Sequence, residues 1–139
     1  PAADIFRGIF ASFSSEAAED LSLAETLTLE AGEAALPPQS RAKHLLVLLE
    51  GNLNVELPGT EPATGLVRPG DVIGELAILT DKPSPVLYRC ASRCVFAALP
   101  REACQRLLAR FPRSCTLSLL HFIVGCTATW LHRVDACLE

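Results

Sequence analysis

Residues 69–83 read Pro-Gly-Asp-Val-Ile-Gly-Glu-Leu-Ala-Ile-Leu-Thr-Asp-Lys-Pro, and this stretch decides the fold and the site. It opens on a proline–glycine turn, passes through a short apolar segment and closes at a proline. Gly74 frees the backbone to approach a ligand closely, and the first amides of a short helix over 74–80 would form an anion site. Glu75, beside those amides, suits the hydroxyls of a sugar attached to a phosphate.

The composition is that of one globular domain over residues 1–139. Half of the residues are hydrophobic, so the chain can bury an ordinary core. No apolar run reaches membrane-spanning length, so we expect no direct membrane insertion. The first four residues lack the basic and apolar regions of a signal peptide. Methionine is absent even from position 1, which favours a fragment of a larger protein; removal of the initiator is the alternative.

The formal net charge of −4 argues against nucleic acid as a partner, because neutralising phosphates needs clustered Lys and Arg. One cluster of arginines does occur late in the chain, and we interpret it as a solvated helix face. Its members are Arg101, Arg106, Arg110 and Arg113.

The six cysteines do not have the spacing of a metal site. No Cys-x-x-Cys pair occurs, and most of the cysteines lie in strongly apolar surroundings, where thiols behave as small hydrophobes. We expect no bound metal, and reduced thiols in a cytoplasmic protein. The cysteines are Cys90, Cys94, Cys104, Cys115, Cys126 and Cys137.

The periodicity of apolar residues divides the chain into three parts. Residues 1–23 are predicted to form a helical segment, because apolar side chains recur at helical intervals and line one stripe. The stripe consists of Ile5, Phe6, Ile9, Phe10 and Phe13. Residues 24–99 are predicted to consist mainly of strands, with the short helix over 74–80 among them. From Arg101 the period is helical again, and two helices are expected over 101–137, with Pro112 between them and the last helix beginning near Ser114.

Turn residues separate the predicted strands. Gly51-Asn52 between two apolar runs is a signal for a tight hairpin, and Gly32 is assigned to an earlier hairpin. The predicted strands cover residues 26–30, 34–36, 44–50, 53–57, 86–88 and 94–96.

The chain resembles the cyclic-nucleotide-binding-domain family. The resemblance is carried by Gly74-Glu75-Leu76-Ala77 followed by Pro83, by the turn glycines, and by the order of helix, strands, residues 69–83 (the cassette), strands and two helices. It implies an α+β, mainly β fold: an antiparallel β-roll, similar to a double-stranded jelly roll, with an N-terminal helix and two C-terminal helices. In the family the counterpart of Glu75 accepts a hydrogen bond from the ribose, and Gly74, Leu76 and Ala77 supply backbone groups around the cyclic phosphate. Alternatively, Glu75 only caps the short helix.

The sequence departs from the family at the phosphate partner. Nucleotide-binding members follow the proline with an arginine and a small residue, whereas this chain has Ser84 and Pro85. Losing such a charged partner costs ~2–5 kcal/mol, which is about one and a half to three and a half decades of affinity. We therefore expect a vestigial pocket without a cofactor; the alternative is a working sensor of cyclic AMP or cyclic GMP that uses another cation. Arg89 lies too far along the chain to substitute.

A narrower resemblance points to the regulatory repeats of neuropathy target esterase, in the patatin-like lysophospholipase family. It rests on Gly74-Glu-Leu-Ala-Ile-Leu-Thr80, Lys82-Pro83, Cys94-Val-Phe96, Phe111-Pro112 and the predicted helix through His132-Arg-Val-Asp135. The resemblance implies a lysophospholipase as the parent protein, on the cytoplasmic face of the endoplasmic reticulum. A bacterial Crp-type regulator and a kinase regulatory subunit are alternatives, although no DNA-binding helix-turn-helix follows in this chain.

The domain itself lacks the motif of a hydrolase. A patatin-type nucleophile needs a Gly-x-Ser-x-Gly elbow, which is absent. No motif pairs His44, His121 or His132 with a serine or cysteine nucleophile. We therefore expect a regulatory or interaction module rather than an enzyme.

The predicted last helix carries two apolar rows. One row can pack on the β-roll, so the other is expected to contact a second copy of the chain or a neighbouring domain. Burial of both rows in the core is the alternative. The first row is Cys115, Leu119, Ile123, Cys126, Trp130, Val134 and Cys137, and the second is Leu117, Leu120, Val124, Leu131 and Leu138.

Overall fold

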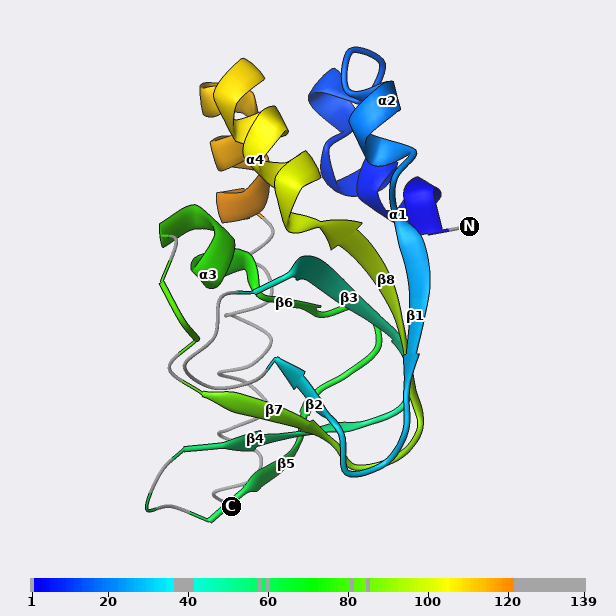
Figure 1. The fold of residues 1–139 in the computed structure, drawn as a ribbon, viewed down its shortest axis with the longest axis vertical. Coiled ribbons are helices and arrows are strands. Elements are labelled where there is room, and N and C mark those ends of the chain that lie inside the picture. Colours follow the sequence, from blue (N-terminus) through cyan, green and yellow to red (C-terminus); the bar gives the residue numbers. More distant parts are fainter. Residues whose placement is uncertain are drawn as a thin grey trace.

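The computed structural model describes residues 2–36, 42–57, 59, 61–80, 82–84 and 86–121. The described part of the chain begins and ends with helical elements, and strands make up most of its middle (Figure 1). The elements are α1 (Ala2–Ile9), a 3₁₀ turn (Ala11–Phe13), α2 (Ala18–Leu21), β1 (Glu25–Leu29), β2 (Ala34–Leu36), β3 (His44–Glu50), β4 (Leu53–Glu56), β5 (Ala63–Val67), β6 (Val72–Ile73), α3 (Glu75–Thr80), β7 (Leu87–Cys90), β8 (Cys94–Pro100) and α4 (Arg101–Arg110). A further helix begins at Pro112 and is described as far as His121.

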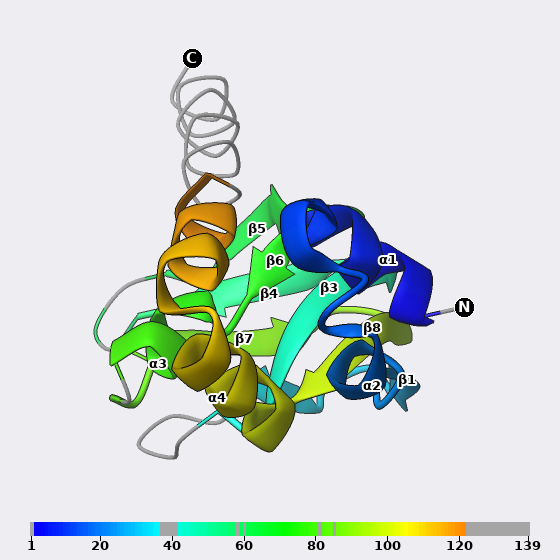
Figure 2. The ribbon, with the colours of Figure 1, turned by 90° about the horizontal axis from the view of Figure 1, so that it is seen from above.

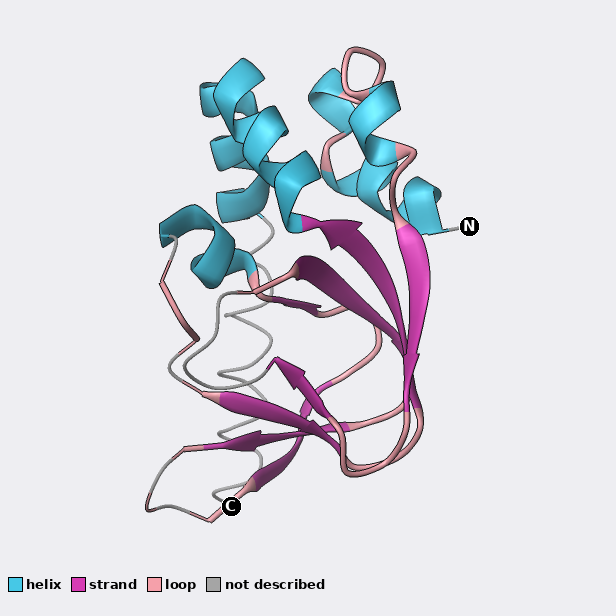
Figure 3. Cartoon of the chain, viewed as in Figure 1, coloured by secondary structure: helices cyan, strands magenta, loops and turns pink. Residues whose placement is uncertain are grey.

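Two four-stranded sheets form the β-roll, as Figure 3 shows. One sheet has the order β1-β8-β3-β6 and the other has the order β2-β7-β4-β5. Every strand pair among the described residues is antiparallel. The predicted α+β fold with an antiparallel β-roll is therefore confirmed.

The predicted hairpins at Gly32 and Gly51 are wrong. β1 and β2 lie in different sheets, and so do β3 and β4, so each of these turns carries the chain from one sheet to the other. At the second crossing the turn packs on the β7–β8 connection: the Ala91 N–H donates to the Asn52 carbonyl at 2.9 Å, and the Asn52 N–H donates to Ser92 Oγ at 3.2 Å. Gly51 was correctly predicted as a turn residue, but the neighbouring Asn52 hydrogen-bonds to the connection between β7 and β8 instead of closing a hairpin.

Alternating side chains of the central strands serve two core layers. Leu46 and Leu48 of β3 face the space between the sheets, together with Phe96 of β8. Leu45 and Val47, between them in sequence, belong to the layer under the helices. Both faces of this sheet are thus buried, which explains why β3 is a continuous apolar run. Figure 2 shows α1, α2 and α4 gathered over the same side of this sheet.

The N-terminal apolar stripe is confirmed in part. Phe6, Phe10 and Phe13 are buried in the layer under the helices. Ile5 is exposed, contrary to the prediction, whereas Ile9 is partly buried against the core. The buried phenylalanines follow helical steps of four and three, and Ile5, one position before Phe6, points away from that line.

A buried carboxylate joins the two helical ends of the chain. Asp20 of α2 is 5% exposed and accepts a hydrogen bond from Arg106 Nε of α4 at 2.7 Å. Arg110 lies 3.7 Å from the same carboxylate. Two members of the arginine cluster thus hold α2 against α4. The interpretation of the cluster as a solvated helix face did not predict this contact.

The boundaries of two predicted helices shift slightly. α3 begins at Glu75 rather than at Gly74, whose φ of +89° lies outside the helical range. The last helix begins at Pro112, two residues earlier than predicted. Only its first turns are described: Cys115 and Leu119 of the first row are buried, and Leu117 and Leu120 of the second are exposed. The other members of both rows lie outside the described residues, so the predicted interface stays a prediction.

Candidate functional site

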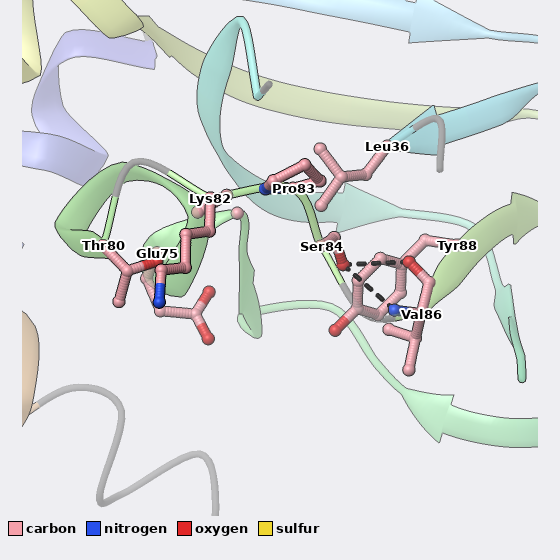
Figure 4. Close-up of a pocket in the computed structure, with 10 residues that line it drawn as sticks. Leu36, Glu75, Thr80, Lys82, Pro83, Ser84, Val86 and Tyr88 are labelled. Atoms are coloured by element: carbon pink, nitrogen blue, oxygen red, sulfur yellow. Dashed lines mark hydrogen bonds between the residues drawn. The ribbon is translucent and has the colours of Figure 1, made fainter. Parts of the chain in front are cut away.

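A pocket of about 450 Å³ opens beside α3 and the start of β7. In Figure 4, Glu75, Thr80 and Lys82 lie on one side of the view, and Ser84, Val86 and Tyr88 lie on the other. The described lining residues are Leu36, Gly74, Glu75, Ala77, Thr80, Lys82, Pro83, Ser84, Val86 and Tyr88. The lining therefore comes from β2, from Gly74 and α3, from the segment between α3 and β7, and from β7 itself.

The turn before the cassette is tied to β3. The Gly70 N–H donates to the Leu48 carbonyl at 2.7 Å, and the Leu48 N–H donates to the Asp71 carbonyl at 3.0 Å. Asp71 also accepts a hydrogen bond from the Arg68 N–H at 3.0 Å through its side chain. These bonds fix where α3 begins relative to the sheet.

The backbone of Gly74 lies close to β3, which leaves no room for a side chain. Its φ is +89°, and a Cβ atom placed there would lie 3.0 Å from the His44 carbonyl oxygen. Its own carbonyl accepts a hydrogen bond from the Ile78 N–H at 3.1 Å, which starts α3. A side chain at this position would be strained in φ and crowded against β3.

Glu75 places a carboxylate in the pocket without an external donor. Its Oε2 atom is buried and has no hydrogen-bond partner among the described residues. Burial raises the pKa of Glu75, and a hydrogen bond from its own backbone amide lowers it in part. The local amide bond agrees with the alternative that Glu75 helps to start the helix, but it leaves one oxygen available to a ligand.

Ser84 lines the pocket with its hydroxyl already engaged. The hydroxyl donates to the Val86 carbonyl at 2.9 Å and accepts from the Val86 N–H at 3.3 Å (Figure 4). The neighbouring Pro85 lies outside the described residues. Arg89 does not line the pocket: its Nε donates to Glu56 at 2.7 Å, and its guanidinium donates to the Gly32 carbonyl at 2.9 Å.

The structure brings together most of the residues that the sequence singled out. Gly74, Glu75, Ala77 and Ser84 all line one pocket. Leu76 lies in α3 between two of them, and its side chain is not described. The expectation that this pocket is vestigial and holds no cyclic nucleotide stays a prediction.

Three polar residues of the pocket, Thr80, Lys82 and Tyr88, were not among the predicted site residues. Tyr88 contributes a phenol, whose pKa is raised by burial and by the negative charge of Glu75. Lys82 is exposed and is the only cation among the described lining residues. Tyr88 lies two residues after Val86 within the predicted strand 86–88, and this spacing was an available signal that both side chains face the same side.

Glu75→Gln is expected to stabilise the fold at neutral pH, on the order of 1 kcal/mol, because it removes a buried charge whose Oε2 atom lacks a donor among the described residues. The folded chain binds a proton on Glu75 more tightly than the unfolded chain does, since folding raises the pKa. The wild type therefore gains stability as the pH falls through that raised pKa towards 4.5, and its deficit relative to the variant shrinks. Urea unfolding at several pH values checks this; a deficit that grows towards low pH would contradict it.

The described thiols are unsuited to nucleophilic chemistry. Cys90, Cys94, Cys104 and Cys115 are free and buried. Burial raises the pKa of Cys90 and of Cys104 to about 12 and that of Cys115 to about 11, so these thiols stay protonated at neutral pH. The described residues contain no cluster of histidine, cysteine and carboxylate side chains that would hold a metal ion.

Comparison with known proteins agrees with the fold. The family model of the cyclic nucleotide-binding domain matches residues 26–111. The fold is similar to that of a candidate cyclic nucleotide-binding protein from Geobacter metallireducens GS-15, with a TM-score of 0.72 and 17% identity over 89% of this chain and 92% of that one. A cyclic nucleotide-binding domain from Methylobacillus flagellatus KT is also similar in fold, with a TM-score of 0.70 and 22% identity; the match covers 96% of this chain and 83% of that one.

The catabolite activator protein of Thermus thermophilus is also similar in fold, with a TM-score of 0.61 and 19% identity over 94% of this chain. The chain spans 61% of the length of that protein. No curated protein matches the sequence. In the part of the chain that the structure describes, no helix has the length and apolar character needed to cross a membrane.

Proposed function

The chain belongs to the family of cyclic nucleotide-binding domains, and from this premise we propose that it is a regulatory module of a larger protein whose pocket holds neither cyclic AMP nor cyclic GMP with micromolar affinity. Domains of this family regulate other domains rather than catalyse reactions. The module would therefore act through its contacts with the rest of its parent protein.

The environment of Ser84 carries the proposal. Ser84 stands where nucleotide-binding members have the arginine that meets the phosphate, and its hydroxyl is bonded to Val86 of its own loop. A cyclic phosphate would enter a largely apolar pocket beside the Glu75 carboxylate, without a charge-assisted partner at this position. The expected loss of ~2–5 kcal/mol moves the affinity out of the micromolar range.

Thermal unfolding in the presence of cyclic nucleotide tests the proposal. A ligand at 100 times its dissociation constant stabilises a protein by roughly 2.7 kcal/mol, which shifts the midpoint by several degrees. We expect no such shift when cyclic AMP or cyclic GMP is added in large excess over a micromolar dissociation constant. A saturable shift with half-maximal effect in the low micromolar range would contradict the proposal.

A cyclic-nucleotide sensor is the second candidate, and one observation favours it. Lys82 lines the pocket, and its exposed side chain is free of ion pairs among the described residues. Its ammonium would be the substitute cation for the phosphate. If a cyclic nucleotide does bind, Lys82→Gln should weaken it strongly in this candidate, whereas Arg93→Gln, which removes a cation outside the pocket, should not.

The parent protein is proposed to be a patatin-like lysophospholipase of the neuropathy target esterase type, at the cytoplasmic face of the endoplasmic reticulum. The support is the sequence resemblance in the cassette and in the C-terminal elements. The partner would be a neighbouring domain or a second copy, reached through the helix after Pro112. A full-length coding sequence without a Gly-x-Ser-x-Gly elbow would contradict this parentage.

A further inference from the structure

The carboxylate of Glu75 is a buried negative charge that the described residues do not neutralise. Its Oε2 atom is enclosed, and no described residue donates a hydrogen bond to it. Burial raises the pKa of Glu75, and what lowers it in part is a hydrogen bond from its own backbone amide rather than a neighbouring cation. Buried charges in proteins are paired as a rule. The described part of the pocket therefore offers a negative charge without its counterpart.

The nearest cations along the chain do not supply that counterpart. Lys82 lines the pocket, but its side chain is exposed and does not reach the buried Oε2 atom with a hydrogen bond. Arg89 does not line the pocket, because its guanidinium is held by Glu56 and by the Gly32 carbonyl. A positively charged ligand would supply what these two side chains do not.

The rest of the lining suits an apolar body of small size. The pocket has a volume of about 450 Å³, and the Ser84 hydroxyl at its wall is already bonded to its own loop. In Figure 4, the Tyr88 ring and the Glu75 carboxylate lie on opposite sides of the view. The apolar and aromatic wall is formed by Leu36, Ala77, Pro83, Val86 and Tyr88. A ligand with a positive charge at one end and an apolar body would meet both parts of this lining, and an aromatic face also attracts a cation.

We propose that the pocket binds an organic cation, a protonated amine on an apolar or aromatic body, and that Glu75 forms an ion pair with its ammonium group. The ammonium N–H donates the hydrogen bond that Oε2 lacks, and such a charge-assisted bond is stronger than one between neutral groups. The body lies against the wall that includes Tyr88. The inference rests on the proposed function, because a pocket that holds an anionic cyclic phosphate would have the opposite charge preference.

An NMR titration with 2-phenylethylamine tests this, with 2-phenylethanol as the uncharged probe of the same carbon skeleton. We expect the amide signals of Gly74, Ala77 and Tyr88 to shift saturably with the amine, since these residues line the pocket. A hydrogen bond between charged groups makes roughly a tenfold difference in affinity or more. The alcohol is therefore expected to bind at least about tenfold more weakly.

Three variants assign the charge preference to its residue. Glu75→Gln keeps the size of the side chain and should weaken the amine at least about tenfold. Lys82→Gln removes a like charge beside the ligand, so it should raise the affinity for the amine or leave it unchanged. This is opposite in sign to its effect on a cyclic nucleotide in the sensor candidate. Glu61→Gln removes an exposed carboxylate outside the pocket and should leave the affinity unchanged.

The outcomes separate this inference from the proposed function. Absence of amine binding, equal affinity for the amine and the alcohol, or equal affinity of the wild type and Glu75→Gln overturns the inference. Weaker binding of the amine to Lys82→Gln overturns it as well. If cyclic AMP is silent in those cases, the proposed function still stands, whereas low-micromolar binding of cyclic AMP to the wild type overturns the proposed function itself. Glu75→Gln is suited to the test because it is expected to fold at least as stably as the wild type.

Discussion

Gly51→Ala is expected to lower the free energy of unfolding by about 2–5 kcal/mol. The glycine has a φ of +102°, and a Cβ atom there would lie 2.5 Å from the carbonyl oxygen of Arg93 and 2.8 Å from Cys94 Sγ. The left-handed conformation costs an L-residue roughly 1–2 kcal/mol, and overpacking adds about 1–3 kcal/mol. The clash is with the backbone of the β7–β8 connection, which cannot move without shifting β8, the strand between β1 and β3.

Gly32→Ala is the matched control, because it shares the conformation without the crowding. Gly32 has a φ of +92°, and a Cβ atom there would meet no heavy atom within 4 Å. We expect this variant to lose only roughly 1–2 kcal/mol. Urea unfolding of both variants measures the difference, and equal losses would show that the two crossings between the sheets are not packed as described.

Phe96→Ala should cost about 3–5 kcal/mol, the usual range for removing a buried phenylalanine. Phe96 is fully buried between the two sheets. On β8 it is paired with Leu27 of β1 and with Leu48 of β3, so its ring lies at the middle of the inter-sheet core. A cavity at this point would loosen the sheet on which the helices pack.

Val95→Ala provides the comparison on the same strand. Val95 is only partly buried and pairs with Thr28 and Glu50. We expect a loss of less than about 1 kcal/mol, as for substitutions away from the core. Chemical denaturation measures both losses. If Val95→Ala lost as much stability as Phe96→Ala, the described register of β8 would be contradicted.

Much of the fold was predictable because the signals are local. Alternation located β1, a continuous apolar run located β3, and the return of helical spacing at Arg101 located α4. The hairpin at Gly51 was wrong because a tight turn leaves the same local pattern whether its strands pair or enter different sheets. That choice depends on partners far away in sequence, such as Ala91 and Ser92.

The candidate site was predictable only where its residues are contiguous. Gly74, Glu75 and Ala77 follow from one motif, and Ser84 was found because it departs from the family pattern. Tyr88 reaches the pocket through the pairing of β7 with β2 and β4, which no sequence motif describes. The unpaired state of Glu75 Oε2 is also a property of three-dimensional burial and has no local signature.

The central claim is that the chain has the fold of its family but that its pocket does not hold a cyclic phosphate. Isothermal titration calorimetry of the wild-type chain with cyclic AMP tests this claim most directly. We predict no saturable heat with a dissociation constant in the micromolar range. Heat that appears in Ser84→Arg and not in the wild type would locate the loss of affinity at this position. A dissociation constant in the low micromolar range for the wild type would contradict the account.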